Sequence, residues 1–581
     1  MITATAIRVQ RLAARIDPRW VAIGLFVALL VLGIIIFPDY GISTDEATER
    51  RTTIAHYVYV MGPFLRRSGD EFVRYFATHA DSLHEFPQRY YGVFLQALTL
   101  GVEHLFGFRI PSREIYLMRH LFTYLNFWAA GVFFYLLLRR RFPVRKWLPI
   151  VGALLYFLYP RFFAESFYNI KDLLFYSWTV IAVYFALRWV EQRRSKLWIP
   201  AAISIAIATN TRILGVAVLL LTMVAAVVYD LWISPAFDAK PGWRVARRPI
   251  GLAAATGAVY LAITPFLWAN PPRNAARMFI HFLRFPGWGG LHFFRGEWIT
   301  AEVPWYYIPA WIAITSPTLY LALFVVGLIA TTTVVVVATR ALYAAARTSG
   351  RAILNDDGTL GNNTASTFRS LSQNALLYDA YFLLLFTATL AGFILLRIEV
   401  YNGWRHIYFV FLPILYLAVR GLGSINSWIT RLALNTTVTR LALPAWGICV
   451  ALAMTVTGAW MIRNHPFQFA YFNPLARQSV RCRFDLDYWG VSQTNLLRVA
   501  LAMTPEAQVT VFPDVSLRAI MLTDAERERM RFTNDVAEAD WLVQGDDPAC
   551  DWLIPPAGFE PLIVIEVDGM VLSRLHIRAT A

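Results

Sequence analysis

Long apolar runs recur along most of the chain, and short polar or basic gaps separate them. A helix needs about 20 mostly apolar residues to cross the hydrocarbon layer of a bilayer. The pattern therefore predicts a mostly α, polytopic membrane protein with eleven spans. We place them at residues 20–37, 116–138, 147–162, 172–190, 197–211, 213–233, 250–268, 309–338, 376–397, 404–423 and 444–462.

The chain divides into a membrane core, residues 1–462, and a less apolar tail, residues 463–581. In the tail, QVTVFPD, ADWLVQG and EPLIVIEVDG alternate like strands, and LTDAERERMRF is typical of a helix. We predict a small α/β domain there. The first long segment between spans, 38–115, holds the amphipathic run YYGVFLQALTLGVEHLFG, which we expect to lie along the membrane interface. The polar stretch 347–375 is typical of a linker.

Composition and charge agree with a membrane protein. Hydrophobic residues make up 57% of the chain and charged residues only 16%, against about 25% charged residues in soluble domains. The net charge of +15 comes largely from basic residues in alternate gaps, such as 139–146 and 240–248. Cytoplasmic loops carry such an excess. We therefore expect a bacterial inner-membrane protein with a cytoplasmic N-terminus, an extracytoplasmic tail and no nucleic-acid partner.

Acidic and basic residues lie where several spans reach the outer face. Asp45 and Glu46 follow the first span, and a carboxylate there could act as a general base on a hydroxyl or amine. The alternative is a helix cap, because Ser or Thr before acidic residues commonly starts a helix. Glu165, Lys171 and Asp172 fall in the next short outer loop. Lys171 could neutralise a phosphate and Asp172 could orient a substrate; alternatively the two pair and cap the following span.

Further cations lie in other outer turns. Arg212 stands between two spans, and Arg405 and His406 form a pair suited to phosphate binding. The alternatives are side chains that snorkel to headgroups and an interfacial aromatic belt. In the tail, His465, Asp485 and Asp487 either bind an acceptor or brace the membrane core. Together, carboxylates and cations suit a transfer reaction whose leaving group is a lipid phosphate, since cations stabilise the developing charge.

Several segments resemble the GT-C superfamily of polytopic glycosyltransferases. The similarity is greatest to bacterial members related to family 39, which includes protein O-mannosyltransferases and lipid A aminoarabinose transferases. The motifs that carry it are the pair Asp45–Glu46, RFFAESFYNIKD, TNTRILG, VPWYYIPAWIAITSP, YNGWRHIYF, HPFQFAYFNPL and FDLDYWG. The small α/β tail departs from the β-trefoil module of eukaryotic mannosyltransferases, so the resemblance does not extend to a protein acceptor.

The resemblance implies a GT-C-like core and a polyprenyl-phosphate-linked sugar donor. It implies inversion at the anomeric carbon, with Asp45 as base, Asp172 as a second acidic residue, and Lys171, Arg212 and Arg405 as phosphate contacts. We add Glu46, Glu165 and His406 as candidate substrate-binding residues. Family members differ in their use of a divalent metal, and no ligand spacing here demands one. The alternative functions are a polyprenyl-lipid transporter or flippase and a non-catalytic envelope scaffold.

The sequence does not identify the sugar, the envelope acceptor or the oligomeric state. Cys482 and Cys550 both fall in the tail, on the expected oxidising side, and could form a disulfide. Whether they pair is left open by their number alone.

Overall fold

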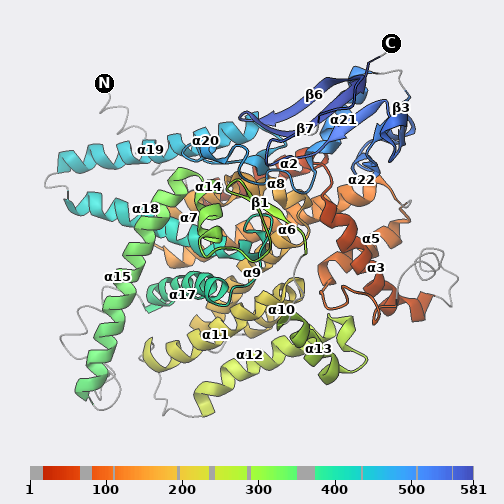
Figure 1. Cartoon of the computed structure of the whole chain (residues 1–581). Coiled ribbons are helices and arrows are strands. Elements are labelled where there is room, and N and C mark those ends of the chain that lie inside the picture. The colour runs from red at the N-terminus through yellow and green to blue at the C-terminus, as the bar shows by residue number, and fades with distance from the viewer. Residues whose placement is uncertain are drawn as a thin grey trace.

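The computed structural model describes residues 17–65, 82–108, 111–192, 196–233, 243–283, 289–349, 373–432, 436–504, 508–552 and 554–579. Helices form most of the molecule, and a small sheet with helix α21 (Ser492–Met503) gathers at the top of the view (Figure 1). The predicted fold class, a mostly α membrane protein with a small C-terminal α/β unit, is confirmed. The boundary at residues 462 and 463 stays a prediction.

Eight helical segments of the described chain are long and apolar enough to cross a membrane, and each overlaps one predicted span. The helices concerned are α2 (Pro18–Ile36), α6 (Arg113–Arg141), α9 (Asp172–Glu191), α11 (Val216–Val228), α15 (Thr318–Ser349), α17 (Gln373–Leu395), α18 (Phe411–Leu432) and α19 (Thr436–Arg463).

Three predicted spans take another form. The run 147–162 is split between α7 (Leu148–Phe157) and α8 (Pro160–Tyr168), which are bent by 60°. Helix α10 (Trp198–Thr211) is apolar but short, and the predicted span 250–268 falls on α12 (Trp243–Ala262), which is not among the eight. The described chain thus holds eight candidate spans, or nine if the bent pair crosses once, and the total of eleven is not confirmed.

Proline explains two of the differences in helix boundaries. The predicted span 309–338 is divided into α14 (Tyr307–Thr315) and α15 at Ser316–Pro317, and α7 and α8 part just before Pro160. Proline has no N–H for the helix ladder and disfavours helical geometry in the residue before it.

Small residues let α15 and α18 approach closely. A Cβ atom on Gly327 would lie 1.8 Å from the carbonyl oxygen of Leu417, and one on Gly421 would lie 2.0 Å from that of Leu323. Backbones in membrane helix pairs approach this closely only where such side chains are missing. This pairing fixes α18, whose N-terminal extension η5 (Arg405–Val410) carries two predicted site residues, Arg405 and His406.

The segment between α2 and α6 contains helices rather than an extended loop. They are α3 (Thr44–Leu65) and α5 (Phe94–Phe106). A second segment, which precedes α14, contains helix α13 (Pro271–Leu283) and a hairpin of the strands β1 (His292–Phe294) and β2 (Glu297–Ile299). Leu98, Leu105 and Phe106 on α5 are exposed. This agrees with the amphipathic helix expected at the membrane interface.

The tail sheet has five strands in the order β4-β3-β5-β7-β6. Strand β3 pairs in parallel with β4 and β5, whereas β7 is antiparallel to β5 and β6. The strands are β3 (Val509–Phe512), β4 (Met530–Phe532), β5 (Trp541–Gln544), β6 (Phe559–Val567) and β7 (Met570–Arg578), with the short helices α20 (Arg477–Val480), α22 (Ser516–Ala519) and α23 (Asp524–Glu528).

The sequence predicts β3, β5 and β6 correctly and misses β4 and β7. The predicted helix LTDAERERMRF covers only α23, which Thr523 and Glu526 cap reciprocally, and its last residues form β4 instead. Cys482 and Cys550 form a disulfide, which answers the question of their pairing. Most of the predicted linker 347–375 lies outside the described residues.

Candidate active site

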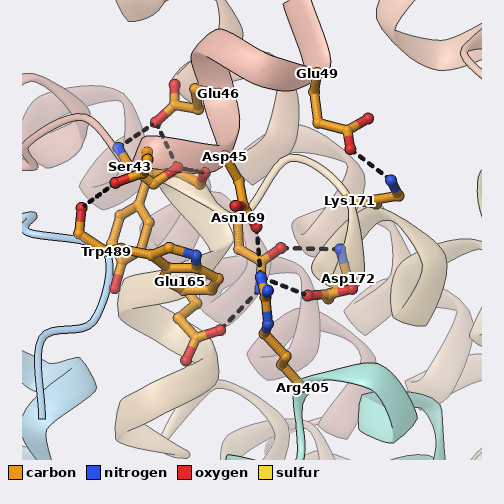
Figure 2. Close-up of polar contacts among 12 residues, drawn as sticks. Ser43, Asp45, Glu46, Glu49, Glu165, Asn169, Lys171, Asp172, Arg405 and Trp489 are labelled. Atoms are coloured by element: carbon orange, nitrogen blue, oxygen red, sulfur yellow. Dashed lines mark hydrogen bonds and ion pairs between the residues drawn. The ribbon is translucent and has the colours of Figure 1, made fainter. Parts of the chain in front are cut away.

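Four charged residues from four separate segments form a chain of ion pairs, which we call the charged site. Asp45 lies in the first turn of α3, Asp172 begins α9, Arg212 ends α10 and Arg405 begins η5. Arg405 binds Asp45, Arg212 binds Asp172, and the Arg405 guanidinium is also 3.9 Å from Asp172. Figure 2 shows Asp45 and Asp172 turned toward Arg405 from two different helices. The structure thus brings four of the predicted residues together.

The two adjacent carboxylates of α3 point to different surroundings. Glu46 is fully buried, accepts hydrogen bonds from the Ser43 N–H (2.9 Å) and hydroxyl (3.2 Å), and contacts His120 at 3.1 Å. Glu46 therefore forms the helix cap that the sequence allowed as an alternative. The Asp45 side chain instead remains 41% exposed beside Arg405. A substrate-binding role for Glu46 stays a prediction.

Asp172 is held in place by a turn behind the charged site. Its N–H donates to Asn169 (2.9 Å), and the Asn169 amide donates to Glu165 (2.9 Å). Glu165 also accepts a hydrogen bond of 2.8 Å from the Tyr408 hydroxyl and is buried. The contacts of Glu165 thus position the start of α9, and a direct substrate contact by Glu165 stays a prediction.

Lys171 does not pair with its neighbour Asp172. Its ammonium group lies 2.5 Å from Glu49 and 4.1 Å from the centre of the Tyr91 ring. Glu49 was not predicted, although it lies one helical turn after Asp45, a spacing that places two side chains on one face. Lys171 therefore stands beside the charged site, held by α3.

Aromatic rings surround the guanidinium of Arg405. Its central carbon lies 5.1 Å from the Tyr401 ring centre, 5.7 Å from Tyr488 and 5.3 Å from Trp489. Cations over aromatic faces are stabilised electrostatically. His406 packs against Tyr401 with ring centres 4.5 Å apart and takes no part in the ion pairs of the site. Its predicted phosphate-binding role stays a prediction.

Tyr488 and Trp489 belong to the tail, so the tail covers part of the charged site. The Trp489 carbonyl accepts a hydrogen bond of 3.1 Å from the Thr44 hydroxyl, next to Asp45. The sequence pointed to the motif FDLDYWG, but to no role for its two aromatic residues. The feature of the sequence that could have indicated a role for Tyr488 and Trp489 is their position beside Asp485 and Asp487, in a tail segment rich in aromatic and polar residues.

Two of the three tail residues that were predicted either to bind an acceptor or to brace the membrane core contact other parts of the molecule. His465 binds Asp39 at 2.8 Å, in the short helix η1 (Phe37–Asp39) that follows α2. Asp487 accepts hydrogen bonds from the N–H groups of Val491 (2.9 Å) and Ser492 (2.8 Å) at the start of α21. Asp485 accepts one from the Phe293 N–H of β1 (3.1 Å). The contacts of His465 and Asp485 tie the tail to the segment after α2 and to the β1–β2 hairpin, whereas those of Asp487 lie within the tail.

Asp45 is ionised at neutral pH. Burial opposes its ionisation, but the charge of Arg405 and its hydrogen bond outweigh that effect, so the pKa of Asp45 lies below its ordinary value. A carboxylate in this state can accept a proton only weakly while Arg405 stays bound to it. Across the described ranges, no three His, Cys, Asp or Glu side chains are placed to hold a metal ion.

Burial of Asp485 predicts a pH-dependent stability. Burial raises the pKa of Asp485 to about 7, whereas an unfolded Asp titrates near 3.9. The native state therefore holds an extra proton between about pH 4 and pH 7, and stability falls as pH rises through this window. We expect the free energy of unfolding to drop by about 1–4 kcal/mol, measured by chemical denaturation at pH 4.5 and 8.

The matched variant for this measurement is Asp485→Asn, whose amide oxygen still accepts a hydrogen bond from the Phe293 N–H but whose side chain does not titrate. Its stability should change clearly less over the same pH range. Burial also raises the pKa of Asp487, to about 6, and that of Asp546, so a slope smaller than that of the wild type should remain. Equal slopes for the two proteins would contradict the assignment to Asp485.

The fold and the charged site define a polytopic membrane protein with a carboxylate–guanidinium centre at one end of its helices. No family model and no curated protein matches the chain. Among solved structures, it is similar to ArnT from Cupriavidus metallidurans bound to undecaprenyl phosphate, with 14% identity over 96% of this chain and 98% of that chain and a TM-score of 0.40. The apo state of ArnT gives 14% identity, 95% and 97% coverage and a TM-score of 0.38.

Proposed function

We propose that the protein is an inverting glycosyltransferase that moves a sugar from a polyprenyl-phosphate donor to an acceptor at the outer face of the membrane. The observation that carries this proposal is the alternation of Asp45, Arg405, Asp172 and Arg212, with Lys171 beside them. A phosphate needs fixed cations, and an acceptor needs a nearby carboxylate. The charged site combines the two at one end of apolar helices.

In the proposed reaction, the donor phosphate contacts Arg405, Arg212 and Lys171. An acceptor oxygen or nitrogen attacks the anomeric carbon, the bond from this carbon to the phosphate oxygen breaks, and polyprenyl phosphate leaves with the electron pair. Asp45 takes the acceptor's proton. The phosphate competes with Asp45 for Arg405, and this weakens the contact that depresses the pKa of Asp45. Donor binding thereby makes Asp45 a stronger base when an acceptor arrives.

The transporter alternative requires a polar path through the bundle. The buried stretch 411–419 of α18 is apolar apart from Tyr416 and separates Arg405 from Arg420 by roughly 20 Å. Charged residues occur at both ends of this helix. The apolar stretch between them favours chemistry at one surface over passage of a headgroup.

The test of the proposed function is transfer from a panel of radiolabelled polyprenyl-phosphate sugars by the purified full-length protein, with envelope extract as acceptor. We expect label to move to an extract component only when both donor and protein are present. Donor that crosses the bilayer of reconstituted vesicles without any label transfer would favour a transporter. A folded protein that binds none of the donors would favour the scaffold.

Lys171→Gln should raise the KM for the donor about 10-fold and change kcat less. Loss of one charge-assisted contact to a phosphate costs about 1.5 kcal/mol, mostly in binding. Initial rates over a range of donor concentrations separate the two constants. Glu49→Gln is the matched control, because it removes the partner of Lys171 and keeps the cation. If both variants raise KM equally, the ion pair matters for structure and Lys171 is not a phosphate contact.

A further inference from the structure

A second group of charges, built around a buried carboxylate, lies at the other end of α6 and α18. It consists of Arg141, Arg145, Asp379, Tyr416 and Arg420, and we call it the basic cluster. Asp379 is fully buried and accepts hydrogen bonds from Arg141 (3.0 and 2.8 Å), from the Tyr416 hydroxyl (2.5 Å) and from Arg420 (3.5 Å). Arg141 ends α6 and Arg420 follows Arg405 by about four turns of α18, so the cluster is remote from the charged site.

Arg145 is fixed against α18 next to these groups. It donates hydrogen bonds of 2.5 Å each to the Gly423 carbonyl and the Ser427 hydroxyl. A Cβ atom on Gly423 would lie 2.6 Å from the Arg145 guanidinium, so only glycine leaves room for this position. Arg420 lies on the same face of α18 and donates to Ser424 (2.6 Å). Arg145 is therefore placed by specific contacts, unlike a basic side chain that extends freely into water.

The basic cluster has more positive than negative charge. Arg141 and Arg420 share the Asp379 carboxylate, and Arg145 adds a third guanidinium group beside them, so the three cations exceed the one carboxylate by two charges. Burial, together with the charges of Arg420 and Arg141, lowers the pKa of Arg145. Grouped and partly desolvated cations repel one another unless an anion offsets them. Since each guanidinium has five N–H donors, the three groups retain donors beyond those that bind protein atoms.

The surroundings indicate which anion fits. On the loop that carries Arg145, Val144 is 90% exposed and Trp147 is 42% exposed, at the end of apolar helices. Apolar and aromatic side chains next to cations are typical of the level of lipid headgroups. Guanidinium groups bind phosphate oxygens in a bidentate manner, and basic pockets between membrane helices bind anionic headgroups. We propose that the basic cluster binds the phosphate of an anionic phospholipid, independently of the charged site.

Native mass spectrometry of the full-length protein, titrated with cardiolipin or with phosphatidylcholine, tests this proposal. The test variant is Arg145→Gln with Arg420→Gln, which leaves Arg141 to pair with Asp379. The matched control is Arg139→Gln with Lys146→Gln, which removes the same charge from two exposed residues of the same region. We expect the wild type to bind cardiolipin in preference to phosphatidylcholine. The test variant should bind cardiolipin about 10- to 30-fold more weakly, and the control within a few fold of the wild type.

Three outcomes would overturn the proposal. An equal loss of cardiolipin in both variants would mean that general surface charge attracts the lipid. If the test variant binds cardiolipin as tightly as the wild type and unfolds at a similar temperature, the basic cluster is not the lipid-binding site. Inorganic phosphate that binds the wild type and not the test variant, while cardiolipin binds both equally, would identify a soluble anion as the ligand. A test variant that fails to fold is replaced by Arg145→Gln alone, for which about half of the effect in free energy is expected.

Discussion

Asp45→Asn is expected to lower the rate of sugar transfer about 1,000-fold and to leave donor affinity within a few fold of the wild type. The asparagine keeps an oxygen for Arg405 but cannot take a proton from the acceptor, and a positioned general base contributes about 100- to 10,000-fold to a rate. Initial rates with saturating radiolabelled donor, together with donor binding measured separately, give the two quantities. The variant should fold normally, since its side chain is 41% exposed.

Two neighbouring carboxylates serve as controls for Asp45. Asp39→Asn, which removes a partner of His465 at the end of α2, should transfer sugar within a few fold of the wild type. Glu46→Gln should mainly lower stability, because Glu46 is buried against Ser43 and His120. A transfer rate within 10-fold of wild type in Asp45→Asn would show that another group accepts the proton. Glu46 would then be the first alternative to examine.

Arg405→Gln should have the largest effect on both activity and stability. Removal of the buried cation leaves Asp45 and Asp172 facing each other without a shared partner, and such a loss costs about 3–5 kcal/mol. Transfer should fall by at least about 1,000-fold, because the donor phosphate also loses its central contact. Thermal unfolding in detergent and the transfer assay measure the two effects. Arg405→Lys keeps the positive charge without the planar guanidinium group, so its transfer rate and its stability should lie between those of the wild type and of Arg405→Gln.

A double variant separates the structural part of this effect from the chemical part. Asp172→Asn removes the second carboxylate, so its combination with Arg405→Gln should restore part of the lost stability. Contacting residues show such non-additive free energies. Transfer should remain at the low level of Arg405→Gln. Recovery of activity together with stability would mean that Arg405 acts only in folding.

The apolar pattern was sufficient to predict the class of fold and most of the helices, because a membrane span is visible in the sequence as about 20 consecutive, mostly apolar residues. It failed where helix continuity depends on local chemistry or tertiary contacts. The break at Ser316–Pro317 was visible in the sequence but lies inside an apolar run. Strand β7 was missed, although its partner β6 was found and the turn Asp568–Gly569 between them has the positive φ angles of a tight hairpin.

The candidate site was predicted as a set of residue types and only partly as a geometry. The positions of Asp45, Asp172, Arg212 and Arg405 in the gaps between predicted spans predicted that they lie at one membrane face, and the structure brings them together. Which of them pair depends on how the helices pack, so the alternative in which Lys171 pairs with Asp172 is wrong, and Glu49 was not predicted. Tyr488 and Trp489 could not be assigned because they approach Arg405 from the tail, far along the chain.

The separation of the site's parts along the chain also has a consequence for its biogenesis. Arg405 follows its partner Asp45 by 360 residues, and Trp489 follows Thr44 by 445. At about 5–20 residues per second, roughly 20–70 s of translation pass before Asp45 can meet Arg405. A nascent protein already inserted in the bilayer by its early helices therefore has no complete reaction centre. Products of stalled translation that end before residue 405 should be inert toward lipid-linked sugars.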